Sequence, residues 1–438
     1  MIEPAPRPVL RPIPRWVIVV GIPVMVLVAA GAVWVLLGTG VSGGQLDAIR
    51  TGGTLGVGLG GIVVLWLAVR RQRSTELDLL QKYEAHRLAE RVAATGEEDA
   101  TARRITELYA KAVDQLGSDK APVRLGGLYA LERLAQDNAD PQLRQTVANV
   151  LCAYLRMPTP DTGGRPHTVQ QEREVRRTAQ RILEHHLKPG PDVDHPLDSF
   201  WPAITLDLTG ATLGRFDLSD CVLDTARFAG TTFTQKVTFH RTRFVGEAMF
   251  TNAVFAGDAS FDHATFAGPT DFTEATCRAS ASFFAARFHD DVRFGTGTFA
   301  DHAVFAEAEF GGDAWFTRCD FGGYATFTGA TFGADAWFDD SGFADGAGFT
   351  SARFERSAMF GNTRFAGLST FADAEFSTGA WFEGAQFEGH TAFAARVRVD
   401  HLDTDKVCWP DGVVLGDEPA PIEGRPGTWV RLGRVRPG

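Results

Sequence analysis

The second half of the chain contains a phenylalanine series whose spacing alternates between five and six residues. From Phe233 to Phe393 the series has 30 centres, and Cys277 is the one centre that is not phenylalanine. The residue two positions before each centre is always small, as at Ala248 and Ala336. The intervening residues lack the second apolar stripe that an amphipathic helix would need. Repeats this short predict a solenoid in which each coil stacks on the last and buries a continuous core.

The outward residues of this series indicate the length of one coil. Each six-residue step ends at a centre, and the residue just before that centre points outward. Along the chain these outward residues alternate between a large and a small side chain. One column is mostly large and reads Met249, Asp271, Arg293, Trp315, Trp337, Met359 and Trp381; the other is small and reads Thr238, Ser260, Ser282, Val304, Thr326, Gly348, Thr370 and Ala392. A four-sided coil of 22 residues places the two columns on opposite faces. With the five centres that precede the series, from Leu208 to Phe228, the rod has 35 sides and makes about nine coils; at ~4.8 Å per coil it is roughly 40 Å long.

The interior of such a rod must hold the phenylalanine rings. Burying one ring contributes on the order of 1.5–3 kcal/mol before entropy losses, so the rings hold the stack together. Glycine follows two residues after the centre in about half of the six-residue steps, as at Gly246, Gly257 and Gly268. We expect these glycines to form the tight turn at a corner.

The entry to the series has a recognisable motif. Residues 206–213 read Leu-Asp-Leu-Thr-Gly-Ala-Thr-Leu, and the centres continue as Leu208, Leu213, Leu218, Leu223 and Phe228. Because of these motifs, residues 205–393 resemble the pentapeptide-repeat family. This chain departs from the family pattern by an extra residue at every second side. The resemblance implies a right-handed quadrilateral β-helix with one pentad per side. The segment from Gln115 to Arg133 is also similar to the helical region of bacterial membrane-anchored pentapeptide-repeat proteins.

Two uncharged stretches near the N-terminus are long enough to cross a bilayer. They are residues 16–37 and 52–69, and each can span a hydrocarbon core of roughly 30 Å as a helix. Arginines precede the first stretch and follow the second, whereas the loop 38–51 has only Asp47 and Arg50. The positive-inside rule then places the N-terminal arm 1–15 and the C-terminal mass in the cytoplasm. The sequence therefore predicts a two-pass protein of the cell membrane whose lipid contacts are these two helices.

Between the second span and the repeat the composition is typical of helices. Residues 74–157 are rich in Glu, Lys, Arg, Leu and Ala, and a break at Asn138–Pro141 predicts a helical hairpin within this connector. Residues 158–204 read as a linker followed by one more helix. Residues 394–438 lose the repeat, and we expect them to cap the last coil or to form a tail.

The residues give no support for catalysis, cofactor binding or a metal site. No nucleophile stands beside a base, and the five cysteines are far apart, which indicates reduced thiols. The pair His185-His186 has no third ligand in view and diverges by about 100° on a helix, so we interpret both as surface residues. The sequence thus predicts a protein that is not an enzyme.

The outward column Trp315, Trp337, Met359 and Trp381 is the candidate protein-binding stripe. Packing of these rings under the C-terminal tail or in a homodimer is the alternative. Residues 201–400 have 26 acidic and 14 basic side chains, which argues against nucleic acid as a partner. We therefore predict a membrane-tethered scaffold for an unidentified protein partner. The alternative function, implied by the family resemblance, is an acidic DNA mimic that modulates a type II topoisomerase.

Overall fold

The computed structural model describes residues 45–158, 166–192, 194–400, 402, 407–419 and 421–434, with scattered positions between 20 and 38. The chain divides into two compact units, Met1–Arg103 and Arg104–Gly438. The long helix α2 (Gln45–Leu116) runs through the boundary between them.

The first unit is mainly the N-terminal part of α2. In the part of the chain that the structure describes, no helix combines the length and the apolar composition that a membrane crossing requires. The predicted span 16–37 falls largely on residues outside the described set, and most side chains of the span 52–69 do so as well. Both spans remain predictions from the sequence.

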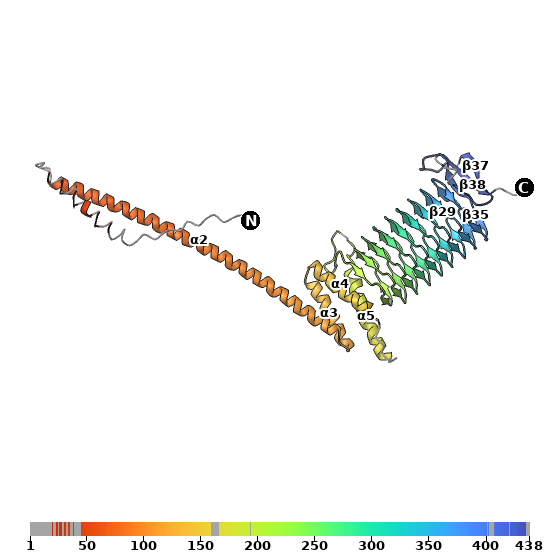
Figure 1. Cartoon of the computed structure of the whole chain (residues 1–438), viewed down its shortest axis with the longest axis horizontal. Helices are drawn as coiled ribbons and strands as arrows, with labels where there is room; N and C mark the ends of the chain where they lie inside the picture. Colours follow the sequence, from red (N-terminus) through yellow and green to blue (C-terminus); the bar gives the residue numbers. More distant parts are fainter. Residues whose placement is uncertain are drawn as a thin grey trace. The chain divides into compact units, whose positions relative to one another are not determined.

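The second unit begins with a helical bundle that covers one end of the solenoid (Figure 1). After the end of α2 it contains α3 (Ala121–Asp137), α4 (Pro141–Arg156) and α5 (Pro166–His186). Helices α3 and α4 form a hairpin, and its second helix begins where Asp140 accepts a hydrogen bond from the Gln142 amide and Pro141 supplies a fixed φ. Buried Glu172 of α5 ties the bundle together, because it pairs with Arg124 at 2.8 Å and accepts the Tyr154 hydroxyl at 3.1 Å.

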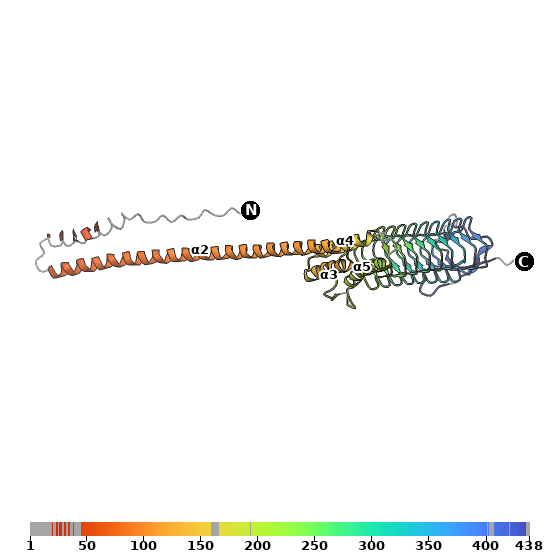
Figure 2. The same ribbon diagram turned by 90° about the horizontal axis from the view of Figure 1, so that it is seen from below.

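The solenoid is a right-handed, four-sided coil of parallel two-residue strands, seen from two directions in Figures 1 and 2. The β1 sheet contains β1 (Leu206–Asp207), β5 (Ala226–Arg227), β9 (Ala248–Met249), β13 (Thr270–Asp271), β17 (Val292–Arg293), β21 (Ala314–Trp315), β25 (Ala336–Trp337), β29 (Ala358–Met359) and β33 (Ala380–Trp381). The β2 sheet contains β2 (Thr212–Leu213), β6 (Thr232–Phe233), β10 (Val254–Phe255), β14 (Thr276–Cys277), β18 (Thr298–Phe299), β22 (Asp320–Phe321), β26 (Gly342–Phe343), β30 (Arg364–Phe365) and β34 (Gln386–Phe387).

The other two sides follow the same order. The β3 sheet contains β3 (Phe216–Asp217), β7 (Val237–Thr238), β11 (Ala259–Ser260), β15 (Ala281–Ser282), β19 (Ala303–Val304), β23 (Ala325–Thr326), β27 (Ala347–Gly348), β31 (Ser369–Thr370) and β35 (Thr391–Ala392). The β4 sheet contains β4 (Val222–Leu223), β8 (Arg243–Phe244), β12 (Thr265–Phe266), β16 (Arg287–Phe288), β20 (Glu309–Phe310), β24 (Thr331–Phe332), β28 (Arg353–Phe354) and β32 (Glu375–Phe376), and it continues into β36 (Arg396–Arg398), β38 (Trp429–Arg434) and β37 (Val413–Pro419).

The strand register confirms the predicted coil of 22 residues. Ala336, for example, pairs with Ala314 before it and with Ala358 after it. The start of the rod is tighter: Leu206 pairs with Ala226, because the first steps are all five residues long. The last turn is also one residue shorter, since Glu375 pairs with Arg396. The predicted rod of about nine coils is confirmed as well.

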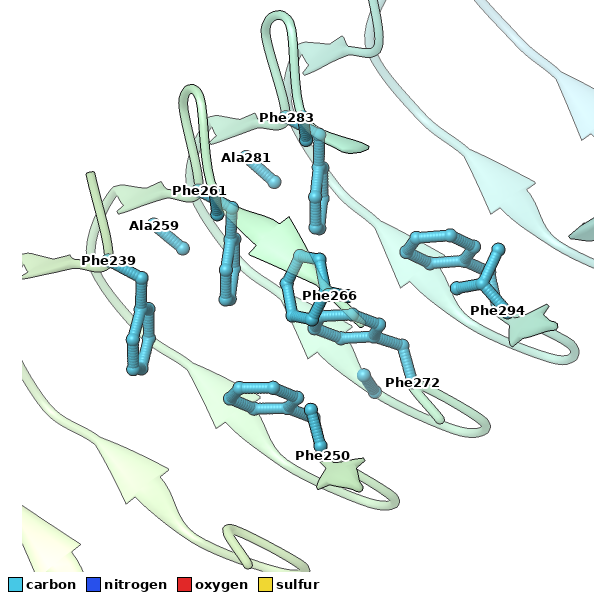
Figure 3. Packing of buried hydrophobic residues seen from close by; sticks show 14 of the residues in the cluster. Phe239, Phe250, Ala259, Phe261, Phe266, Phe272, Ala281, Phe283 and Phe294 are labelled. Carbon is cyan, nitrogen blue, oxygen red and sulfur yellow. The ribbon is translucent and has the colours of Figure 1, made fainter. Parts of the chain in front are cut away.

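The interior is a set of phenylalanine stacks (Figure 3). Along the rod most rings stack on the equivalent ring of the next coil, as Phe250 does on Phe272 at 4.6 Å and an interplanar angle of 2°. Across the rod neighbouring stacks meet edge to face, as Phe261 and Phe272 do at 5.3 Å and 88°. Both arrangements suit the aromatic quadrupole. The small residues, such as Ala259 and Ala281 in Figure 3, are buried in the space that the rings leave.

The expectation that glycines two residues after a centre make the corner turn is wrong. Gly246 and Gly268 do not adopt a positive φ. A Cβ at Gly268 would instead lie 2.8 Å from the carbonyl oxygen of Gly246 in the preceding coil. Most positive φ values of the rod fall in the five-residue steps, at residues such as His263 and Glu307, and Gly346 and Gly379 are exceptions in six-residue steps. Gly246 and Gly268 therefore allow close approach between successive coils rather than a turn.

The C-terminal segment covers the far end of the core. Strand β36 extends the β4 sheet in parallel, and β38 and β37 add to it antiparallel. Trp409 lies against the last rings, 5.7 Å from Phe376 and 6.5 Å from Phe382. Trp429 is buried beneath Arg425, whose guanidinium carbon lies 5.3 Å from the indole centroid. The segment closes the open end that a solenoid would otherwise expose.

Candidate protein-binding surface

The predicted stripe lies on consecutive strands of one sheet. Strands β21, β25, β29 and β33 place Trp315, Trp337, Met359 and Trp381 at directly paired positions. Each of these side chains is half-buried, whereas the alanine that precedes it points into the core. The strand pleat thus turns the four large side chains outward in a single column, which we call the tryptophan column.

A cation already lies at the Trp315 end of the column. In the preceding coil, on β17, Arg293 lies over the Trp315 ring with its guanidinium carbon 5.1 Å from the centroid. This is the distance of a cation–π contact. Farther along, Trp337 has a buried indole N–H that has no hydrogen-bond partner among the described residues. The column therefore presents aromatic faces to cations, and the buried indole N–H of Trp337 beneath it has no acceptor among the described residues.

Acidic residues flank the column on both edges. On one edge Asp313 and Asp335 each accept an amide N–H from the coil above, at 3.1 and 3.0 Å. On the other edge Asp339 accepts the Gly361 amide at 2.8 Å, and burial raises the pKa of this carboxyl. The residues from 301 to 350 have nine acids and one base. The face is aromatic at its centre and negative along its borders, which favours a basic partner segment.

The C-terminal tail meets the column at its end. The backbone of Cys408 pairs with that of Trp381 in an isolated parallel β-bridge. The Phe382 amide donates a hydrogen bond to the Cys408 carbonyl at 2.7 Å. Trp409 and Trp429 lie at the end of the phenylalanine core. The tail is fixed there by Arg425, which donates to Glu355 at 3.2 Å and to Ser377 at 3.1 Å. Although burial opposes it, the hydrogen bonds that Arg425 and the Ser377 hydroxyl donate to Glu355 hold the pKa of this carboxyl below its usual value.

The opposite face is built from small residues, as the sequence predicts. Thr326 lies in the same coil as Trp315 but in the β3 sheet, and Gly348 follows it in the next coil. Gly348 is buried, because Tyr324 extends across it; a Cβ there would lie 2.6 Å from the tyrosine oxygen. Burial raises the pKa of Tyr324. Of these two opposite faces, the β1 sheet is therefore the one that presents a column of large apolar side chains.

The described residues contain no group of three or more side chains suited to hold a metal ion. Burial raises the pKa of Cys152, Cys277 and Cys319 to about 12 and raises that of Cys221 further still. Thiols with such pKa values are protonated at neutral pH and are poor nucleophiles.

The interpretation of both helix-end histidines as surface residues is wrong for one of them. His185 is exposed, but His186 is buried and stacks on Trp201 at 4.1 Å. Its Nδ1 lies 2.6 Å from the Ser199 carbonyl oxygen and its Nε2 lies 3.0 Å from a Glu132 carboxylate oxygen. Residue spacing could not reveal this contact, because Trp201 and Ser199 reach His186 only after the chain turns into the first coil.

Sequence reasoning also missed a group of arginines at the start of the rod. Arg173 and Arg177 lie on α5, and Arg215 lies in the first coil. The sequence contained one indication of this group: the two arginines are four residues apart on a predicted helix, and this spacing places like charges on one face.

Comparison with known proteins agrees with the coil geometry. The family model for pentapeptide repeats (9 copies) matches residues 218–265 and 298–342. No curated protein and no solved structure matches the chain. The matched segments lie within the four-sided rod of parallel strands described above. The solenoid of this chain therefore belongs to the pentapeptide-repeat family.

Proposed function

We propose that the protein is a membrane-tethered, non-enzymatic scaffold that binds a protein partner through the tryptophan column. Pentapeptide-repeat solenoids are generally structural or interaction modules, which supports the class of function. The observation that carries the proposal is the register of Trp315, Trp337, Met359 and Trp381 on four successive strands of one sheet.

The physical chemistry of the column suits binding. Tryptophan is frequent among the residues that dominate interface energies, and a contiguous half-exposed aromatic strip is costly to leave in water. The strands beneath the column are held on both sides by neighbouring coils, so the side chains are already in place before binding. Little ordering entropy is then lost when a partner docks.

The partner that fits this face is a basic segment with apolar side chains. Acidic residues such as Asp313 and Asp340 border the column, and Arg293 already stacks on Trp315 within the chain. A partner arginine or lysine can occupy the neighbouring indole faces in the same way, at roughly 0.5–2 kcal/mol for each contact.

The tether is proposed from the sequence. Residues 16–37 and 52–69 lack charged side chains, and arginines flank the pair on the outer sides. Such a pair places the solenoid in the cytoplasm at the cell membrane. The two-pass topology can be tested by cysteine labelling. A cysteine introduced in loop 38–51 should react with an impermeant maleimide on intact cells, whereas one introduced in the arm 1–15 should not.

The column can be tested by partner capture. The triple variant Trp315→Ser, Trp337→Ser and Trp381→Ser should keep the circular dichroism of the parent and lose the crosslinked partner in a pull-down from cells. Leu368→Ser with Val245→Ser is the matched control, because both residues are exposed and apolar but lie outside the column. Capture that is unchanged in the triple variant would reject the column as the binding surface, and so would an equal loss of capture in the control.

Mimicry of DNA is the second candidate, and the charge of the rod is the observation in its favour. Residues 246–393 have 21 acidic and seven basic side chains. A supercoiling assay with DNA gyrase discriminates between the two functions. Inhibition at micromolar protein that survives the triple tryptophan substitution would favour the mimic, and no effect would leave the scaffold.

A further inference from the structure

The first coils of the rod and helix α5 enclose a groove with an unusual charge. The groove has a volume of about 530 Å³. Four arginines line it, namely Arg173, Arg176, Arg177 and Arg215, and none of the described residues that line it is acidic. The rod beyond residue 245 is strongly acidic, so this groove is a local exception in a chain of net charge −11.

One of the four arginines has a structural role. Arg176 is buried and donates hydrogen bonds to the backbone carbonyls of Leu155, Met157 and Thr212, the second at 2.9 Å and the third at 3.3 Å. It therefore satisfies carbonyl groups at the end of α4 and joins that helix to the first coil. Its side chain also lines the groove, so its charge adds to those of the other three arginines.

The other three arginines are exposed and unpaired within the described structure. Arg173, Arg177 and Arg215 have no hydrogen bond or ion pair from their side chains to any described residue. Glu184 and Asp217 lie close enough to feel the charges of Arg177 and Arg215, but neither lines the groove. Three guanidinium groups thus face a shared cavity without a counter-charge inside it.

Local structure holds these charges together against their repulsion. Arg173 and Arg177 are four residues apart on α5, a spacing at which like charges destabilise a helix. Gln180 donates to the backbone carbonyl of Arg215 at 3.1 Å, which fixes the corner from which the third arginine extends. An anion in the groove would convert this repulsion into attraction, since the guanidinium fork matches phosphate oxygens in pairs.

We propose that this groove binds a small ligand carrying two or more phosphate groups. Three exposed guanidinium groups exceed what a single phosphate can neutralise. The volume falls within the range of small-molecule sites, and Val169 and Leu213 add an apolar wall that can contact an organic moiety. The site is separate from the tryptophan column and does not depend on its function.

Isothermal titration calorimetry on the full-length chain in non-ionic detergent tests the proposal. Inorganic pyrophosphate and adenosine diphosphate are the two probes. We expect both to bind the parent protein, and Arg173→Gln with Arg177→Gln to weaken binding by about tenfold or more. Equal affinities for pyrophosphate and adenosine diphosphate would show that the site recognises the phosphate groups alone. Tighter binding of adenosine diphosphate would show that the apolar wall also contributes to binding. Either result supports the site.

A second variant and a control keep the test independent of folding. Arg215→Gln lies in the solenoid rather than on α5 and should weaken binding as well, whereas Arg278→Gln, an exposed arginine farther along the rod, should not. Without ligand, the α5 double variant should melt at an equal or higher temperature than the parent, because the repulsion is relieved. Absence of binding of both probes up to about 1 mM, or binding unchanged by all three substitutions at the groove, would overturn the proposal.

Discussion

Two opposite faces of the same rod share their backbone and their inward side chains, and they differ in their outward side chains. The β1 and β3 sheets have the same number of strands, the same parallel register and the same inward alanine and phenylalanine positions. Outward, one presents Trp315, Trp337 and Trp381, and the other presents residues such as Thr326 and Gly348. Since the repeat constrains only the interior, the large column is not required by the fold. Its size asymmetry points to a role outside the rod.

The largest expected effects lie in the interior, where the two faces should behave alike. Phe316→Ala in the β1 face and Phe327→Ala in the β3 face should each cost about 3–5 kcal/mol of unfolding free energy, because each removes a ring from a close-packed stack. The neighbouring change Trp315→Ser should cost less than about 1 kcal/mol. Urea denaturation followed by circular dichroism measures all three. A larger cost at Trp315 than at Phe316 would mean that the column is structural.

A tryptophan placed on the small face should not be tolerated as it is on the large one. Gly348→Trp should cost about 1–3 kcal/mol, because Tyr324 already occupies the space above the glycine. Thr370→Trp, one coil farther along the same column, is half-buried and should cost less. Thermal melts of the two variants compare them. Equal stability of both would show that Tyr324 does not close this face.

Removal of the Arg293 cation at the Trp315 end of the column should have a smaller effect on stability. Arg293→Ala should reduce stability by roughly 0.5–1 kcal/mol and expose more of the Trp315 ring. With 5-fluorotryptophan incorporated, the ¹⁹F resonance of Trp315 should shift, whereas that of Trp201, buried at the other end of the unit, should not. An unchanged Trp315 signal would contradict the stacked contact.

The smallest expected effect concerns pH at the edge of the column. Burial raises the pKa of Asp339 above its value in the unfolded chain, so its charge costs stability at neutral pH and the cost disappears as pH falls through the folded-state pKa. Asp339→Asn should therefore raise stability at pH 7 by at most about 0.5 kcal/mol, since solvent screens a half-exposed carboxyl. The gain should vanish at acidic pH. A gain that grows as pH falls would reverse the assigned sign.

The sequence predicted the interior of the rod because one residue type repeats at every centre. From Phe233 onward the phenylalanine spacing indicated the sides, and the alternation of Trp337 with Gly348 indicated four sides per coil. The glycines of the six-residue steps were misinterpreted, because a turn and a close approach both favour glycine and only the backbone angles separate them.

Contacts between distant segments were beyond prediction. His186 is buried because Trp201 stacks on it after the chain turns, and Arg215 reaches the arginines of α5 only when the first coil closes. No local pattern near either residue encodes its partner. The capping role of the tail was expected from the physics of open solenoid ends, whereas the place of Trp409 over the last rings depends on the fold of a segment without repeats.

A photocrosslinking amino acid at two positions of one coil tests the central claim most directly. Residues 315 and 326 lie in the same coil, on the β1 and β3 faces. In cells, p-benzoylphenylalanine at position 315 should form a covalent adduct with a protein partner, whereas the same group at position 326 should give none. Equal adducts from both positions, or adducts from position 326 alone, would contradict a working surface confined to the tryptophan column.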